Sequence, residues 1–119
     1  MRTAIPARAR QWTINQGVPE QSGDSGLSWR QMPIDASIRF GAIGNLANDV
    51  WAGGSGGALV HSNDSGEHWQ RVKVVDGGQT LTSDVIGLRM ITRLEIHVLS
   101  ASGEQWATQD GGKTWKREQ

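Results

Sequence analysis

The chain of 119 residues contains no cysteine, and its charges cancel. Without cysteine it has no disulfide, no thiolate nucleophile and no cysteine-ligated zinc site, and the redox state of its compartment stays open. Twelve basic and twelve acidic residues leave no overall field that would attract a polyanionic nucleic acid or an acidic membrane surface. We therefore expect no nucleic-acid partner.

Long hydrophobic runs are also missing. No window approaches a membrane span, and the start, MRTAIPARAR, lacks the apolar stretch of about 7 to 15 residues of a signal peptide. We expect no membrane insertion of this segment. Three arginines precede the first acidic residue, Glu20, so residues 1–9 are interpreted as a basic N-terminal tail, with a solvated tail favoured over a binding arm.

The sequence is rich in glycine and tryptophan, and its apolar residues often recur at every second position. Sixteen glycines separate short stretches in which apolar residues alternate with others. In residues 37–43, Ile38, Phe40 and Ala42 are expected on one face of a strand, and Leu94, Ile96 and Val98 alternate in the same way. No window of eleven or more residues carries a helical stripe. The pattern predicts an all-β protein.

Three octapeptides repeat one spacing: SGDSGLSW, SNDSGEHW and TQDGGKTW. Each places a hydroxyl residue, an aspartate, a glycine and a tryptophan at offsets 0, 2, 4 and 7. These boxes consist of Ser22, Asp24, Gly26 and Trp29, of Ser62, Asp64, Gly66 and Trp69, and of Thr108, Asp110, Gly112 and Trp115. Their aspartates are 40 and 46 residues apart, which is the period of roughly 40 to 50 residues of propeller blades.

The boxes set the register of the expected strands. In the middle repeat these are residues 37–43, 49–53, 57–62 and 68–74, and in the last repeat 84–91, 93–100, 104–108 and 114–118. The first repeat offers residues 10–14 as its second strand, and its first strand is missing. We predict about three four-stranded antiparallel blades of a β-propeller, spanning about 10–33, 34–76 and 77–119 of a segment 10–119, with the first blade incomplete and completed by oligomerisation.

The box spacing suits a self-closing turn. An aspartate side chain can accept hydrogen bonds from backbone N–H groups ahead of it, and a glycine two residues later can adopt a positive φ. The hydroxyl joins the same network, and the tryptophan begins the outgoing strand, where we expect most of its ring to be buried against the neighbouring blade. All twelve box residues are therefore interpreted as structural, because an aspartate held by backbone donors is a poor general acid.

The three octapeptides match the Asp-box, or BNR, repeat of sialidases, sortilin-type receptors and other β-propellers. Residues 50–72, VWAGGSGGALVHSNDSGEHWQRV, also resemble a blade of the photosystem II stability and assembly factor family, which occurs widely in bacteria. The resemblance covers roughly residues 10–118. It implies a non-catalytic propeller that scaffolds or assembles other proteins, often outside the cytoplasm. A sialidase would need a tyrosine nucleophile, and this chain has no tyrosine.

Other candidate sites are weak. GGSGG, residues 53–57, is interpreted as a hairpin because neither a Lys-Ser or Lys-Thr pair nor a helix follows it. His61 and His68 flank the second box but lack a third ligand, so no metal site is expected. Tryptophans outside the boxes could form a patch for sugar or protein, although core packing is favoured. They are Trp12, Trp51 and Trp106.

The sequence thus predicts no enzyme, no cofactor and no assigned ligand-binding residue. We expect a protein-interaction or assembly-scaffold module whose partner is another protein, with a carbohydrate-binding propeller module as the alternative. A structural part of a longer chain is the third possibility. Two copies of three blades would supply a propeller of about four to eight blades, so we expect a homodimeric six-bladed ring. The resemblance alone favours an extracytoplasmic location, periplasmic or lumenal.

Overall fold

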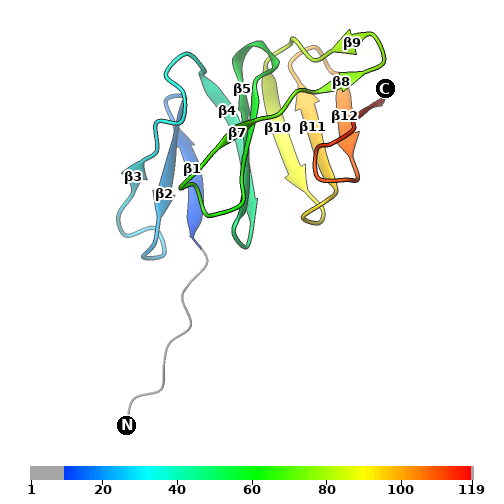
Figure 1. Cartoon of the computed structure of the whole chain (residues 1–119). Helices are drawn as coiled ribbons and strands as arrows, with labels where there is room; N and C mark the ends of the chain where they lie inside the picture. The colour runs from blue at the N-terminus through cyan, green and yellow to red at the C-terminus, as the bar shows by residue number, and fades with distance from the viewer. Residues whose placement is uncertain (1–9, 119) are drawn as a thin grey trace.

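A computed structural model describes residues 10–118, and the expected basic tail at residues 1–9 lies outside them. The described chain is built almost wholly from short antiparallel strands (Figure 1). Three sheets lie side by side in chain order, and we call them blade 1, blade 2 and blade 3. The all-β propeller architecture is confirmed.

Blades 2 and 3 each have four strands. Blade 2 has the order β4-β5-β6-β7, with β4 (Phe40–Leu46), β5 (Asp49–Gly54), β6 (Leu59–Ser62) and β7 (Gln70–Arg71). Blade 3 has the order β10-β11-β12-β13, with β10 (Val85–Met90), β11 (Ile96–Ser100), β12 (Gln105–Thr108) and β13 (Lys116–Glu118). A short 3-10 turn, η1 (Ser55–Gly57), connects β5 and β6, so residues 53–57 comprise the last two residues of β5 and the turn of the β5–β6 hairpin.

Blade 1 has three strands within the described residues. They are β1 (Gln11–Asn15), β2 (Val18–Ser22) and β3 (Arg30–Gln31). Among residues 10–118, the strand that was expected to be missing is absent from this sheet. The inner edge strand β1 contacts β4 of blade 2, just as β4 contacts β10 of blade 3.

A small hairpin between blades 2 and 3 was not anticipated. It consists of β8 (Val75–Asp76) and β9 (Gln79–Thr80), which pair only with each other (Figure 1). The hairpin straddles residue 76, where the sequence placed the end of the second blade, and those blade limits stay a prediction. Val74 and Leu81 flank the hairpin and are buried beside blade 3, so the hairpin covers the outer end of this junction.

Strand boundaries differ from the expected ones where the backbone is irregular. The first strand of blade 2 begins at Phe40 rather than residue 37, and its register shifts between Phe40 and Ala42. This β-bulge turns Phe40 toward a core shared with blade 1 and Ala42 toward a core shared with blade 3. The prediction that Ile38, Phe40 and Ala42 share one face is therefore wrong for Ala42.

The alternation in the last repeat is partly confirmed. Ile96 and Val98 are both buried in the same core, as expected for one face of β11. Leu94 lies before the strand, in the turn after β10, and is 55% exposed. The prediction that Leu94 lies on the buried face is wrong, because β11 begins only at Ile96.

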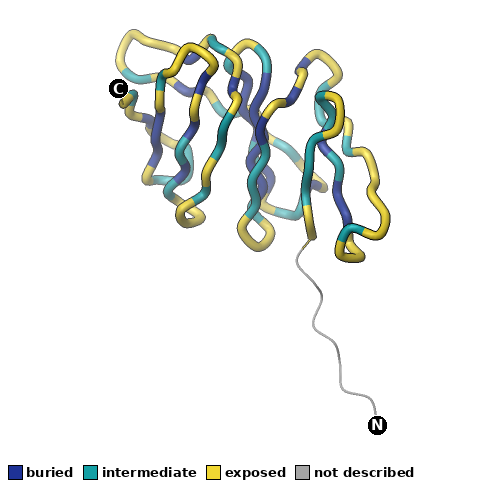
Figure 2. The backbone as a smooth tube through the Cα atoms, turned by 180° about the vertical axis from the view of Figure 1, so that it is seen from behind, coloured by how far each residue is buried: buried dark blue, intermediate teal, exposed yellow. Residues whose placement is uncertain are grey.

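Two hydrophobic cores lie between the blades rather than inside them. The larger core joins blades 2 and 3 around Trp51, Trp106 and Trp115. The smaller one joins blades 1 and 2 around Phe40, Ala52 and Val60. Figure 2 shows the buried residues along the middle of the strands, with the connecting turns exposed at both ends of the sheets. Each blade is thus stabilised mainly by its neighbour.

Candidate functional site

The three boxes form the same hydrogen-bonded turn. In each, the first residue's hydroxyl donates to the aspartate Oδ1, at 2.8 Å in the first box and 2.7 Å in the other two. The same hydroxyl oxygen accepts from the N–H of the box glycine at 2.8 to 2.9 Å. The aspartate Oδ1 also accepts from the N–H four residues later, at 2.9 Å in every box. The hydroxyl and the carboxylate together satisfy the backbone donors of the turn.

The backbone of each turn contains two consecutive left-handed residues. The box glycines have φ of +88°, +89° and +95°. The residue before each glycine is also left-handed, and these residues are Ser25, Ser65 and Gly111. The sequence predicts only the left-handed glycine, because serine rarely adopts this region. The side-chain hydrogen bonds hold the serines there.

These contacts keep the box aspartates ionised. The hydroxyl and N–H of Ser28, followed by the Ser22 hydroxyl, lower the pKa of Asp24 from 3.8 to about 2. Thr114 acts first in the same way on Asp110 and lowers its pKa to about 2. The pKa of Asp64 is held well below its usual range by the Ser62 hydroxyl first and by His68 next. Carboxylates with such low pKa values are unsuited to donate a proton near neutral pH.

His68 is the partner that distinguishes the second box. Its Nδ1 lies 2.6 Å from Asp64 Oδ2, where the other boxes have a hydroxyl donor. The hydrogen bond and the charge of Asp64 raise the pKa of His68 above 6.5. His61 instead lies 2.8 Å from Asp49 and stacks on Trp51, so the two histidines do not share one site.

The box tryptophans differ in burial. Trp115 is 6% exposed and meets Trp51 of blade 2 edge to face, with ring centroids 6.1 Å apart. Trp69 is partly buried and meets Trp12 of blade 1 in the same way at 5.8 Å. Trp29 is 41% exposed, so the expectation of a largely buried ring is wrong there. Within the described residues no blade lies on that side of blade 1 to cover it.

A second indole completes each contact between blades. An added Cβ on Gly66 would lie 2.5 Å from the ring of Trp12, and one on Gly112 would lie 2.7 Å from the ring of Trp51. The box glycine therefore leaves space for the tryptophan of the preceding blade. Trp12 and Trp51 lie 12 and 13 residues before the aspartates of their own boxes. That common spacing was the available signal for their common role.

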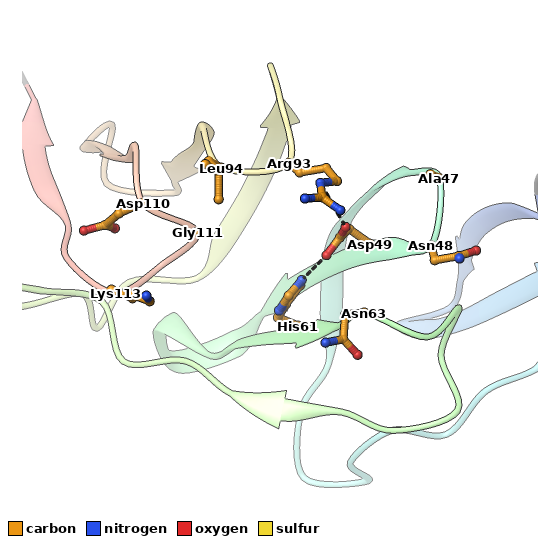
Figure 3. A pocket seen from close by; sticks show the side chains of 10 residues that line it. All are labelled: Ala47, Asn48, Asp49, His61, Asn63, Arg93, Leu94, Asp110, Gly111 and Lys113. Atoms are coloured by element: carbon orange, nitrogen blue, oxygen red, sulfur yellow. Dashed lines mark hydrogen bonds and ion pairs between the residues drawn. The ribbon is translucent and has the colours of Figure 1, made fainter.

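A polar cleft opens where blades 2 and 3 meet at the box turns. Its volume is about 500 Å³, and Figure 3 shows the ten residues that line it. Asp49, His61 and Arg93 gather on one side, with His61 Nε2 2.8 Å and Arg93 Nε 3.9 Å from the carboxylate of Asp49. Asp110 and Lys113 of the third box lie on the other side. We call this the blade 2/3 cleft.

The junction of blades 1 and 2 carries a counterpart of similar size. It is lined by Arg10, Arg30 and Gln21 from blade 1 and by the second box turn. Gln21 Nε2 donates to the Ser65 carbonyl at 2.8 Å and so ties the two blades together. His61 occupies the corresponding position in blade 2, three residues before the box aspartate, but it bonds within its own blade. The blade 2/3 cleft therefore lacks that bridge.

Residues 10–118 were searched for clusters of metal-ligating side chains and for membrane-spanning helices. In this part of the chain no group of three or more His, Cys, Asp or Glu side chains could hold a metal ion. None of the helical segments that the structure describes is long and apolar enough to cross a membrane.

The packed antiparallel sheets and the repeated turns define a β-propeller of the Asp-box type. The sequence model described as "Photosynthesis system II assembly factor YCF48" matches residues 12–119. The chain belongs to this family.

Two curated relatives and two solved structures show how far the similarity extends. The photosystem II assembly lipoprotein Ycf48 of Synechococcus sp. (strain CC9902) is 23% identical over 100 residues, which cover 81% of this chain and 29% of the relative. The chloroplastic photosystem II stability/assembly factor HCF136 of Arabidopsis thaliana is 22% identical over 102 residues, 81% of this chain and 25% of the relative.

The structural similarity covers more of the chain. YCF48 bound to D1 peptide superposes with a TM-score of 0.78 at 19% identity, over 92% of this chain and 36% of that one. YCF48 from Cyanidioschyzon merolae gives a TM-score of 0.74 at 18% identity, over 93% and 36%. The chain therefore shares its fold with about a third of each solved protein.

Proposed function

We propose that this chain is a non-catalytic module that holds another protein during assembly. The observation that carries the proposal is membership, over residues 12–119, of a family of assembly factors. The box aspartates support the absence of catalysis, because each is ionised and already accepts several hydrogen bonds. The chain spans 29% and 25% of the two curated relatives, so this role is proposed for a segment equivalent to part of them.

A polypeptide segment is the proposed ligand. One solved neighbour is YCF48 bound to D1 peptide, and we extend that mode of binding to the blade 2/3 cleft of this chain. Arg93 and Lys113 offer cations there, and Asp49 offers a carboxylate. Side chains of both signs around a cleft of about 500 Å³ suit the mixed chemistry of an extended peptide.

Peptide binding can be measured directly. A fluorescently labelled D1 peptide should bind the chain, and a scrambled peptide of the same composition should bind at least about tenfold more weakly. Lys113→Ala should weaken binding, whereas Lys73→Ala, an exposed lysine outside the cleft, should not. Equal binding of native and scrambled peptides, or equal effects of the two lysine variants, would contradict the proposed site.

Carbohydrate binding is not favoured. Of the tryptophans considered for a sugar surface, Trp51 and Trp106 are fully buried between the blades. Trp12 turns its ring toward Gly66 and Trp69 of blade 2. None of these three rings presents the open face that sugar stacking requires. A glycan array showing selective binding that is lost with a tryptophan variant would reverse this preference.

We also propose that two copies of the chain associate into a six-bladed homodimeric ring. Propellers usually need about four to eight blades around a channel, and cyclic dimers are the commonest closed assemblies. The three described sheets form an arc of adjacent blades with one outer face at each end (Figure 1). Light scattering coupled to gel filtration tests the proposal, and a monomer at every accessible concentration would contradict it.

An extracytoplasmic location is a further proposal. One of the two curated relatives is a lipoprotein and the other is a chloroplastic protein. Fractionation of the source cells followed by immunodetection of the chain tests it. Recovery with the cytoplasmic fraction would contradict it.

A further inference from the structure

A groove at the junction of blades 1 and 2 has a cationic half and an apolar half. The cationic half, of about 500 Å³, contains Arg10 and Arg30. The apolar half, of about 230 Å³, is lined by Met32, Pro33, Ile34, Gly66, Glu67 and Trp69. The two halves share Met32, Gly66 and Glu67, so they form one continuous surface between two described blades. We call this surface the blade 1/2 groove.

One buried side chain, Gln21, brings the two arginines of the groove together. Its Oε1 accepts from Arg10 Nη1 at 3.0 Å and from Arg30 Nη2 at 3.5 Å. Its Nε2 donates to the Ser65 carbonyl at 2.8 Å, which fixes the orientation of the amide. Gln21 is only 4% exposed, so the packing of the two blades holds it in place. Two guanidinium groups thus converge on one neutral oxygen, and an anion beside them relieves their mutual repulsion.

The carboxylates of the described chain do not supply that anion. Among residues 10–118, neither Arg10 nor Arg30 is in an ion pair. Asp64 lines the groove, but its carboxylate is already held by the hydrogen bonds of the second box. Glu67 is exposed on the rim of the groove and has no ion pair in this part of the chain either. Arg93 of the blade 2/3 cleft, by contrast, faces a carboxylate at 3.9 Å.

The apolar half of the groove is fixed before any ligand binds. Trp69 Nε1 donates to the Gly66 carbonyl at 3.0 Å, and the Trp69 ring meets Trp12 edge to face at 5.8 Å. The backbone N–H of Met32 donates to the Pro19 carbonyl at 2.8 Å, which ties the segment after β3 to blade 1. A surface that is already ordered loses little conformational freedom when an apolar side chain packs against it.

We propose that the blade 1/2 groove binds an extended polypeptide segment in which a side-chain carboxylate is followed by an apolar side chain. The carboxylate lies between Arg10 and Arg30, because guanidinium groups bind it through strong charge-assisted hydrogen bonds. The apolar side chain packs against Met32 and Trp69. Both arginines are exposed, so the segment can continue past them, which favours a side chain over a chain terminus. The inference rests on the proposed role of holding another protein, but its site is separate from the blade 2/3 cleft.

Short probe peptides test the chemistry of the segment. The main probe is a hexapeptide with a central Glu-Phe pair, labelled with a fluorophore at its amino end and amidated at its carboxyl end. Fluorescence anisotropy with the 119-residue chain should give a Kd at least about tenfold lower for this probe than for a Gln-Phe probe. A Glu-Ala probe should bind more weakly than the Glu-Phe probe, because it lacks the apolar ring. The advantage of Glu over Gln should shrink at high salt, since the arginines are exposed.

Variants of the chain locate the binding of the probe. Arg30→Gln should abolish the preference for the Glu-Phe probe over the Gln-Phe probe. Arg89→Gln makes the same change at an exposed arginine of β10, outside the groove, and should keep that preference. Glu67→Gln removes the carboxylate that competes for the arginines, so it should tighten binding of the Glu-Phe probe by about twofold to fivefold. Circular dichroism of each variant checks that the chain remains folded.

The outcomes separate this inference from the proposed function. Equal Kd values for the Glu-Phe and Gln-Phe probes, or equal losses with Arg30→Gln and Arg89→Gln, overturn the inference. Acetate that displaces the probe as well as unlabelled probe does also overturns it, because the groove is then a site for any small anion. Tighter binding of a Gln-Phe probe with a free carboxyl end overturns the choice of a side-chain carboxylate. Binding of the D1 peptide that depends on Lys113, without binding of the Glu-Phe probe, supports the proposed function and overturns the inference, and the reverse result does the opposite.

Discussion

The first and third Asp boxes make the same hydrogen bonds in different surroundings. Both place the hydroxyl 2.7 to 2.8 Å from the aspartate Oδ1, and in both the aspartate pKa is about 2. Yet Trp29 is 41% exposed and Trp115 is 6% exposed. The box chemistry is set within eight residues, whereas the burial of its tryptophan depends on the preceding blade. The turn and the core are therefore separate properties of the repeat.

The largest expected difference between the two boxes concerns their tryptophans. Trp115→Ala should lower the free energy of unfolding by about 3–5 kcal/mol, because it leaves a cavity beside Trp51 in the larger core. Trp29→Ala should lower it by about 1 kcal/mol or less, because much of that ring is already in water. Urea unfolding of both variants measures the difference.

The two tryptophan variants also test whether blade 1 is covered in solution. If they destabilise the chain equally, Trp29 must be buried by a contact that the isolated chain does not contain. A concentration-dependent effect of Trp29→Ala would identify that contact as a second copy.

Replacing a box glycine by alanine should cost a stability that depends on the space around that glycine. Gly112 and Gly26 have φ of +95° and +88°, so alanine is strained at both. At Gly112 the new Cβ would lie 2.7 Å from the Trp51 ring, whereas at Gly26 the nearest atom is 3.5 Å away. Gly112→Ala should cost about 2–3 kcal/mol and Gly26→Ala about 1 kcal/mol. Equal costs would show that Trp51 moves aside freely.

The turns can be predicted from the sequence because their hydrogen bonds are local. A spacing of four residue types is enough to specify a hydroxyl, a carboxylate and a left-handed glycine that bond to one another. The same spacing located the three repeats and the three-stranded first sheet. The period of two located most strands of blades 2 and 3, although it placed Leu94 on the buried face and began the first strand of blade 2 too early.

Features that depend on neighbouring blades could not be predicted in this way. The bulge between Phe40 and Ala42 sends two alternating residues to opposite cores. The β8–β9 hairpin has only two residues in each strand, which is too short for a pattern in the sequence. It is stabilised by covering a core that other segments form. Trp29 is exposed because no described blade packs against that side of blade 1. The residues of the box do not determine whether such a blade is present.

The middle box tests whether the network stabilises the fold without taking part in binding. Asp64→Ala removes the acceptor of the Ser62 hydroxyl and of the His68 N–H. The melting temperature should fall by about 5 °C, and the affinity for a peptide in the blade 2/3 cleft should not change. An unchanged melting temperature together with lost binding would contradict the structural role of the box.

The smallest expected effect is an acid dependence shared by the first and third boxes. The pKa values of Asp24 and Asp110 are about 2 in the folded chain, against an ordinary value of 3.8. As the pH falls below about 4, the unfolded chain takes up protons that the folded boxes do not, so their contribution to stability is lost between about pH 4 and pH 2. Asp110→Asn should flatten this part of the pH profile, measured as the urea midpoint from pH 5 to pH 2, and Asp24→Asn should flatten it by a similar amount. Similar effects of the two aspartate variants would contrast with the unequal effects expected for the tryptophan variants and for the glycine variants. A flattening for Asp110→Asn alone would show that the first box is not formed in solution.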